Sequence, residues 1–133
     1  IFPNRDPALR KTSAEFAADA AKRHPYQANA PRGGQAKAGA EVGYVFDRLD
    51  VINLSDVEWT DVELWINQNY VIFLPRMEAK TIKTVPFQAL YDASGNSFPL
   101  GNGKLLNRQP VVVDRVELYR DGKLYDVPVR NVE

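Results

Sequence analysis

The sequence predicts a mainly β fold, an antiparallel β-sandwich preceded by a short N-terminal α-helix. Three observations predict it. From Val42 onward, apolar and polar residues alternate in short runs, as expected for strands with one buried face. Turn-forming residues separate these runs at intervals of about 8 to 12 residues. No helical pattern lies between the runs, so a parallel sheet with crossover helices is not expected.

Length and composition limit the functional classes. A chain of 133 residues fits one domain with one core. Lysine and arginine total 17 and aspartate and glutamate also total 17, so no net charge attracts the chain to nucleic acid or to anionic membranes. The absence of cysteine excludes disulfides, thiolate catalysis and cysteine-ligated metals. No apolar run approaches the roughly 20 residues of a membrane-spanning helix, so no transmembrane segment is expected.

A change in composition divides the chain. Residues 1–40 are rich in alanine, arginine, lysine, glycine and proline, whereas residues 41–133 are rich in valine, leucine, tyrosine and aspartate. We therefore expect an N-terminal helical extension and linker over 1–40 and a β-sandwich domain over 41–133. Within the first part, residues 26–40 contain a proline and two adjacent glycines without any periodicity, which predicts a loop or linker.

The extension carries one helix signal. Thr12 and Glu15 have the spacing of a capping box, in which each side chain satisfies a free backbone donor of the other residue. Pro25 prevents a regular continuation, so the helix is predicted over residues 13–23. Phe16 is its only large apolar side chain, which favours weak packing or insertion into a groove.

The remaining elements are predicted from period-two runs and turn residues. Asp121-Gly122 is the pair that most readily forms the tight turn of a β-hairpin. The predicted strands lie within 42–46, 49–51, 62–66, 70–74, 80–92 and 111–129. This number of short strands favours an immunoglobulin-like topology, although the cysteine–tryptophan–cysteine signature of antibody domains is absent.

Aromatic residues are the strongest candidates for a binding surface, because their rings stack on sugars or insert into a partner at little entropic cost. The predicted binding residues are Trp59, Trp65, Tyr70 and Phe73, with Tyr119 and Tyr125 as further candidates. Trp65 shares the acidic face of its strand, so it is expected to be exposed unless the N-terminal helix or a second chain covers it. The alternative is that these rings fill a core, because β-sandwiches commonly bury a tryptophan.

Catalytic and metal-binding patterns are weak. His24 is the only histidine, which excludes paired-histidine metal sites, and its position at a helix end favours a capping or exposed role. The densest acidic cluster comprises Asp47, Asp50, Asp56, Glu58 and Asp61. Its spacing does not match an EF-hand, and neither does "DASGN" at residues 92–96, so both are interpreted as strand edges or turns. The sequence predicts no catalytic residue, metal or cofactor, and therefore not an enzyme.

Two segments, "VINLSDVEWTDVELWI" and "FQALYDASGN", carry a family resemblance. They resemble bacterial exported or lipoprotein-type β-sandwich domains of the FxLYD-like group. The matching positions are Asn53, Ser55, Val62, Leu90, Tyr91, Asp92 and Gly95. The resemblance implies an exported domain, often tethered to the membrane, with an accessory role and no catalytic residues. "NLS" at Asn53 is also an N-glycosylation sequon.

These observations lead to two functional hypotheses. The first is a non-enzymatic interaction or accessory module of the cell envelope, periplasmic or membrane-tethered, whose partner is another protein or an envelope component. The alternative is a carbohydrate-binding module in which Trp59, Trp65 and Tyr70 form a platform for a glycan. The chain opens with Ile1, which favours a processed piece, produced either by removal of an export signal or by trimming for expression.

Overall fold

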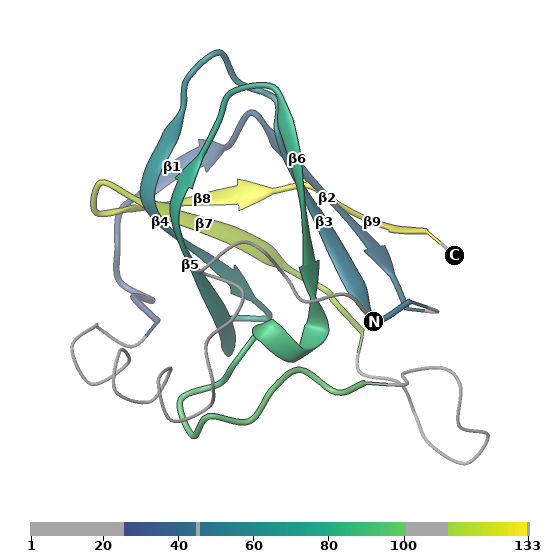
Figure 1. The fold of residues 1–133 in the computed structure, drawn as a ribbon. Coiled ribbons are helices and arrows are strands. Elements are labelled where there is room, and N and C mark those ends of the chain that lie inside the picture. Colours follow the sequence, from purple (N-terminus) through teal and green to yellow (C-terminus); the bar gives the residue numbers. More distant parts are fainter. Residues whose placement is uncertain (1–25, 45, 101–111, 133) are drawn as a thin grey trace.

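The computed structural model describes residues 26–44, 46–100 and 112–132. These residues form nine strands in two sheets that pack across a shared core, so the prediction of a mainly β fold is confirmed (Figure 1). The predicted helix over residues 13–23 lies outside the described residues. Within them, the only helical element is a single 3-10 turn at Phe87–Ala89.

The two sheets divide the strands unequally. One sheet has the order β1 (Arg32–Gln35), β8 (Lys123–Val127), β7 (Val116–Arg120), β4 (Trp59–Ile66) and β5 (Tyr70–Met77). The other has the order β6 (Thr81–Pro86), β3 (Arg48–Asn53), β2 (Ala38–Gly43) and β9 (Val129–Val132). Neighbouring strands are antiparallel except for two pairs, β1 with β8 and β2 with β9, which are parallel.

The two parallel pairs belong to segments that pass from one sheet to the other. The segment β1–β2 runs beside the segment β8–β9, and both leave the five-stranded sheet for the four-stranded one (Figure 1). Backbone hydrogen bonds join the two segments where they pass between the sheets. The amide of Ala36 donates to the carbonyl of Asp126 at 2.8 Å, and the amide of Ala40 donates to the carbonyl of Pro128 at 2.9 Å.

This arrangement corrects the loop prediction for residues 26–40. That segment contains all of β1 and the first half of β2. Every residue of β1 is exposed, so the strand has no apolar alternation from which it could have been recognised. Its backbone is instead held by β8, a partner about 90 residues further along the chain. The boundary placed between residues 40 and 41 therefore falls inside β2.

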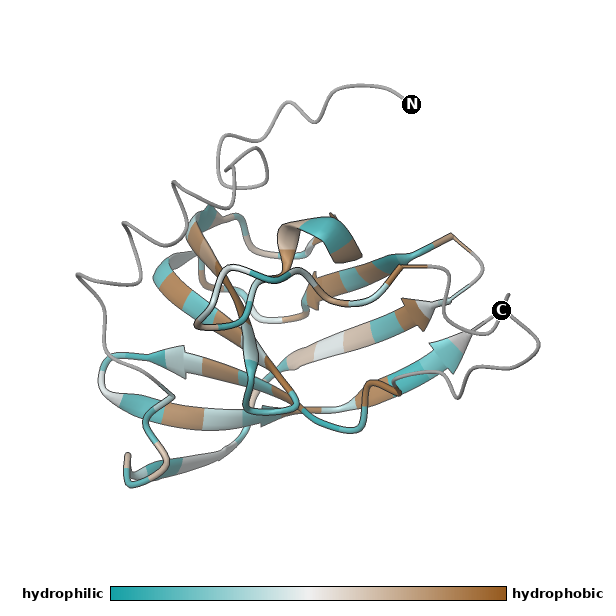
Figure 2. Ribbon diagram, turned by 90° about the horizontal axis from the view of Figure 1, so that it is seen from below, coloured by the Kyte–Doolittle hydropathy of each residue, from teal (hydrophilic) through white to brown (hydrophobic). Residues whose placement is uncertain are grey.

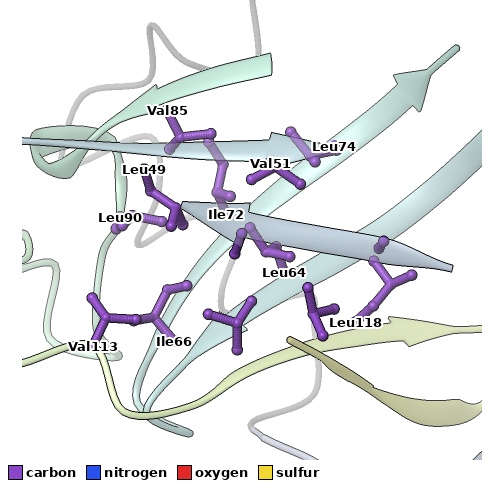
Figure 3. Close-up of a cluster of buried hydrophobic side chains, with 14 of the residues drawn as sticks. Leu49, Val51, Leu64, Ile66, Ile72, Leu74, Val85, Leu90, Val113 and Leu118 are labelled. Atoms are coloured by element: carbon purple, nitrogen blue, oxygen red, sulfur yellow. The ribbon is translucent and has the colours of Figure 1, made fainter. Parts of the chain in front are cut away.

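The core lies between the sheets and follows the predicted alternation. The predicted core residues Val62, Leu64 and Ile66 of β4 are wholly buried. Figure 3 shows Leu64 and Ile66 of β4 in one cluster with buried side chains of the other sheet, such as Leu49 of β3. In Figure 2 the colouring along several strands changes between apolar and polar residues, as expected when one face of each strand is buried.

The alternation breaks once within β4, at Asp61. The backbone of Asp61 has a φ of 49°, which is a left-handed conformation, and Thr60 and Asp61 are both exposed. Before Asp61 an odd-numbered residue faces the core between the sheets, whereas after it the even-numbered residues do. Trp59 therefore joins the core between the sheets, whereas Trp65 lies on the outer face of the five-stranded sheet.

Four aromatic rings, three of them from outside the strands, pack together in the core. Phe87 lies in the 3-10 turn and Phe98 in the connection that follows it, and both are wholly buried. Their ring centroids are 4.8 Å apart in an edge-to-face arrangement. Tyr44 packs against Phe87 at 6.1 Å and Tyr70 packs against Phe98 at 5.0 Å. The four rings form a continuous chain of edge-to-face contacts.

The predicted hairpin turn at Asp121-Gly122 is confirmed. It joins β7 to β8, and both residues have positive φ, 51° for Asp121 and 76° for Gly122. A side chain at position 122 would meet no atom within 4 Å, so any cost of adding one is conformational. We expect Gly122→Ala to lower the free energy of unfolding by about 1 kcal/mol, measured by urea denaturation.

The matched control for this turn is Gly39→Ala. Gly39 lies in β2 without a positive φ, and its added Cβ would contact only Ile52 at an ordinary 3.7 Å. Its free energy of unfolding should change by less than about 0.5 kcal/mol. Equal losses for the two variants would contradict a conformational requirement at Gly122.

Candidate functional site

The structure distributes the four predicted binding residues over different surroundings. Trp59 lies in the core between the sheets and is 1% exposed. Tyr70 is half-buried and packs against the same core. Trp65, 7% exposed, and Phe73, half-buried, belong to neighbouring strands on the outer face of the five-stranded sheet. The four side chains therefore do not form one continuous surface.

Trp65 was expected to be exposed unless another element covers it, and the structure shows it buried. The ring of Tyr26 contacts it edge to face, with the centroids 5.3 Å apart. The indole Nε1 of Trp65 donates a hydrogen bond to Oε1 of Glu63 at 3.0 Å. With Val71 it forms a second, smaller apolar cluster, bordered by Tyr26, Tyr91 and Tyr119.

A buried carboxylate lies on the same outer face. Glu117 in β7 is 0% exposed and is surrounded by Tyr26, Arg32 and Arg115, a group that we call the Glu117 cluster. The hydroxyl of Tyr26 donates to Oε1 at 2.7 Å, while Arg32 forms an ion pair with Oε2. Arg115 approaches the same oxygen at 3.4 Å. These donors replace the water that a buried carboxylate loses.

The Glu117 cluster ties β1 and the segment before it to the rest of the sheet. Tyr26 lies in that segment, and Arg32 is the first residue of β1. Glu117 lies in β7, and Arg115 just before it. Sequence reasoning missed the cluster because Glu117 sits at an ordinary polar position of an alternating strand. Its partner Tyr26 is 91 residues away, and no local pattern signals such a contact.

The hydroxyl of Tyr26 predicts a pH dependence. Desolvation, followed by the hydrogen bond to Glu117, raises the pKa of Tyr26 above its usual 10.0. A raised pKa in the folded state means that the stabilisation is complete below about pH 10 and is lost as the pH rises through the folded-state pKa. The difference in unfolding free energy between the wild type and Tyr26→Phe should therefore be constant up to about pH 9 and should shrink above pH 10.

Urea denaturation at a series of pH values measures this difference. Tyr44 and Tyr70, whose pKa values are also raised by burial, are present in both proteins and cancel in the comparison. A difference that grew with pH would show that Tyr26 does not act as the donor.

Two residues of the family resemblance form an ordered turn after β3. Asn53 is wholly buried, and its Nδ2 donates to the carbonyls of Val57 at 2.9 Å and Glu78 at 3.2 Å. Its Oδ1 accepts hydrogen bonds from both the amide and the hydroxyl of Ser55, at 3.0 and 2.7 Å. The amide nitrogen that a glycan would need is thus buried and engaged in the folded chain.

The "DASGN" segment forms a second turn. Oδ1 of Asp92 accepts hydrogen bonds from the amides of Ser94 and Asn96, each at 2.9 Å, and Gly95 has a φ of 84°. This is an Asx-type turn, in which the aspartate serves the backbone. In the ranges that the structure describes, no group of three or more histidine, aspartate or glutamate side chains is placed to hold a metal ion.

Aliphatic side chains that are exposed or half-buried lie around the end of β3, at one corner of the four-stranded sheet. Ile52 and Ile82 are opposite each other in the register of β3 and β6, and Leu54 and Val57 lie in the connection that leaves β3. We call these four residues the apolar corner. Ile82 is 66% exposed, Val57 61% and Leu54 51%. A groove of about 680 Å³ along β2 adjoins the corner and is bordered by Ile52, Leu54 and residues 128–130.

Comparisons of the chain with family models, with curated proteins and with solved structures give no match. The described residues contain no helix that is long and apolar enough to cross a membrane.

Proposed function

We propose that this domain is a non-enzymatic interaction module of immunoglobulin-like topology, acting in the cell envelope as an accessory to another protein. The strand order supports the topology. The series β6-β3-β2 corresponds to strands E, B and A of an immunoglobulin-like sandwich, and the series β8-β7-β4-β5 corresponds to G, F, C and C′. The additional strands β1 and β9 extend A and G across the edge between the sheets.

The apolar corner is the observation that carries the interaction role. Leu54 borders the groove together with Ile52, and Ile82 lies opposite Ile52 on the neighbouring strand. Leu54 and Ile82 are each more than half exposed, and exposed apolar patches are typical of protein-binding surfaces. Ion pairs border them, Lys80 with Asp56 at 3.4 Å and Arg130 with Glu41. An apolar centre with a charged rim is the usual anatomy of a protein interface.

The placement of the tryptophans favours a protein partner over a glycan. Sugar binding by stacking needs flat aromatic faces that are open to solvent. Trp59 and Trp65 are 1% and 7% exposed and lie on opposite faces of β4. The exposed side chains of the apolar corner are aliphatic, which suits contact with another protein surface.

The envelope address is supported by the resemblance at the two turns. The residues that carry the resemblance, Asn53 with Ser55 and Asp92 with Gly95, lie in ordered turns. Fractionation of cells that express the complete coding sequence with an epitope tag tests the address. Tag signal in the cytosolic fraction alone would contradict it.

Site-specific photo-crosslinking in the source cells tests the interaction. A photoreactive residue in place of the exposed Ile82 should give one discrete adduct, and the matched position is Lys123, exposed at the start of β8 in the other sheet. Leu54→Asp should abolish the adduct at position 82, because a carboxylate in an apolar contact is costly. No adduct, or the same adducts from both positions, would refute the proposal.

A further inference from the structure

A second cavity opens at one end of the sandwich, between the β3–β4 connection and the β7–β8 hairpin. Its volume is about 520 Å³, and its lining includes Lys37, Trp59, Thr60, Arg120, Asp121 and Tyr125. This volume lies within the range of small-molecule sites, which combine an apolar wall with a few polar groups. Trp59 and Leu118 supply apolar wall, and Arg120 supplies a charged group.

The ring of Tyr125 holds the guanidinium of Arg120 at this cavity. Its Cζ lies 5.1 Å from the ring centroid of Tyr125, in a cation–π contact. The ring of Tyr125 also lies close to Gly33 in β1. A Cβ added at Gly33 would lie 2.2 Å from Cε2 of Tyr125. Glycine therefore lets the ring lie against the backbone of β1. The guanidinium is positioned by a packed ring and not by an acidic side chain.

Arg120 has an unused hydrogen-bond donor. Its Nε is buried and has no hydrogen-bond partner among the described residues. Buried donors are almost always paired, so the unpaired Nε shows that the protein supplies this guanidinium with too few acceptors. A ligand acceptor at its terminal nitrogens would therefore be favourable. Among the described residues, neither Arg120 nor Lys37 forms an ion pair with an acidic side chain.

The charges around the cavity favour a singly charged anion. Glu58, at its border, is already paired with Arg76. Lys37 and Arg120 then contribute two positive charges, and Asp121 contributes one negative charge. The balance attracts a carboxylate, whereas Asp121 repels a doubly charged phosphate more strongly.

We infer that this cavity binds the carboxylate of a small molecule or of a peptide C-terminus, with Arg120 as the binding residue. The two terminal nitrogens of a guanidinium donate in parallel to the two oxygens of a carboxylate, an arrangement that its fork geometry favours. Lys37 adds a second positive charge at the border. The cavity shares Val57 with the apolar corner, but binding of a carboxylate goes beyond the proposed interaction role.

Nuclear magnetic resonance of the arginine side chains tests the inference on the intact chain. The Nε–H signal of Arg120 is followed while sodium acetate, sodium phosphate or sodium chloride is added at matched ionic strength. Acetate should shift this signal in a saturable manner, phosphate less and chloride not at all. A short peptide with a free C-terminus, compared with its C-terminal amide, then distinguishes the two sources of the carboxylate. Tighter binding of the free peptide than of acetate indicates a peptide end, and equal or weaker binding indicates a small molecule.

Two variants separate the site from general ionic effects. Arg120→Lys keeps the charge but removes the fork, and should weaken acetate binding by about tenfold, followed by backbone amide shifts around the cavity. Lys123→Gln removes a nearby exposed charge that does not line the cavity, and should leave binding unchanged. Tyr125→Leu, which removes the ring beneath the guanidinium, should also weaken binding. Equal shifts with acetate and chloride, or full binding by Arg120→Lys, would overturn the inference.

Discussion

Replacing Phe87 by alanine is expected to lower the free energy of unfolding by about 3 to 5 kcal/mol. Phe87 is 0% exposed and contacts two further rings edge to face, Phe98 at 4.8 Å and Tyr44 at 6.1 Å. The amide of Phe87 also donates to the carbonyl of Asp47 at 2.8 Å, which holds the 3-10 turn in place. The surroundings therefore cannot collapse readily into the space left by the ring. Urea denaturation followed by circular dichroism measures the loss.

Phe46→Ala is the matched control, because it removes the same side chain from the surface. Phe46 is 65% exposed, and the guanidinium of Arg48 lies 5.2 Å from the centroid of its ring. An exposed cation–π contact contributes about 0.5 to 1 kcal/mol, so the expected loss is below about 1 kcal/mol. Comparable losses for the two variants would show that Phe87 is not part of a close-packed core.

Glu117→Gln should lower the free energy of unfolding by about 2 kcal/mol. Glutamine keeps the shape and can still accept from Tyr26, but it removes the charge that pairs with Arg32 and Arg115. This loss of unfolding free energy should be smaller than the loss caused by removing one partner of a fully buried ion pair. The two arginine side chains are 42% and 47% exposed, so they remain partly hydrated when the carboxylate is gone.

Hydrogen exchange shows where the stability is lost. The amide of Leu124 donates to the carbonyl of Pro31, and the amide of Ala36 donates to that of Asp126, so both bonds report on the attachment of β1. Both amides should exchange faster in Glu117→Gln, whereas amides in β3 should change little. Uniform acceleration throughout both sheets would argue against a local role in holding β1.

Glu41→Gln provides the comparison for an exposed ion pair. Glu41 pairs with Arg130 on the four-stranded sheet, where the arginine side chain is 71% exposed. Surface pairs of this kind contribute about 0 to 1 kcal/mol. A loss equal to that of Glu117→Gln would mean that burial of the carboxylate does not matter.

The local sequence pattern was sufficient to predict the elements that neighbouring residues determine. The inward positions of β4 from Val62 to Ile66 and the turn at Asp121-Gly122 were predicted correctly, because each depends on a few neighbouring residues. The strand β1 could not be predicted, because its four exposed residues are ordered by hydrogen bonds to a strand near the other end of the chain.

The candidate sites were less predictable than the fold. Two-fold alternation would place Trp59 and Trp65 on one face, but the left-handed conformation at Asp61 puts them on opposite faces. Tyr125 was selected as an aromatic candidate, yet its role depends on Gly33 and Arg120, which have no sequence pattern in common with it. Such arrangements arise from pairing between distant strands, and a single sequence does not reveal that pairing.

The parallel alignment of β1–β2 with β8–β9 determines how the domain responds to tension. The first and last strands run side by side in the same direction, from Arg32 beside Leu124 to Gly43 beside Val132. A pull that separates the two ends therefore slides these ladders along their length. All of their hydrogen bonds are loaded together and do not open one after another, so forced unfolding is slow in this direction. A domain held at both ends would keep its fold under a steady mechanical load.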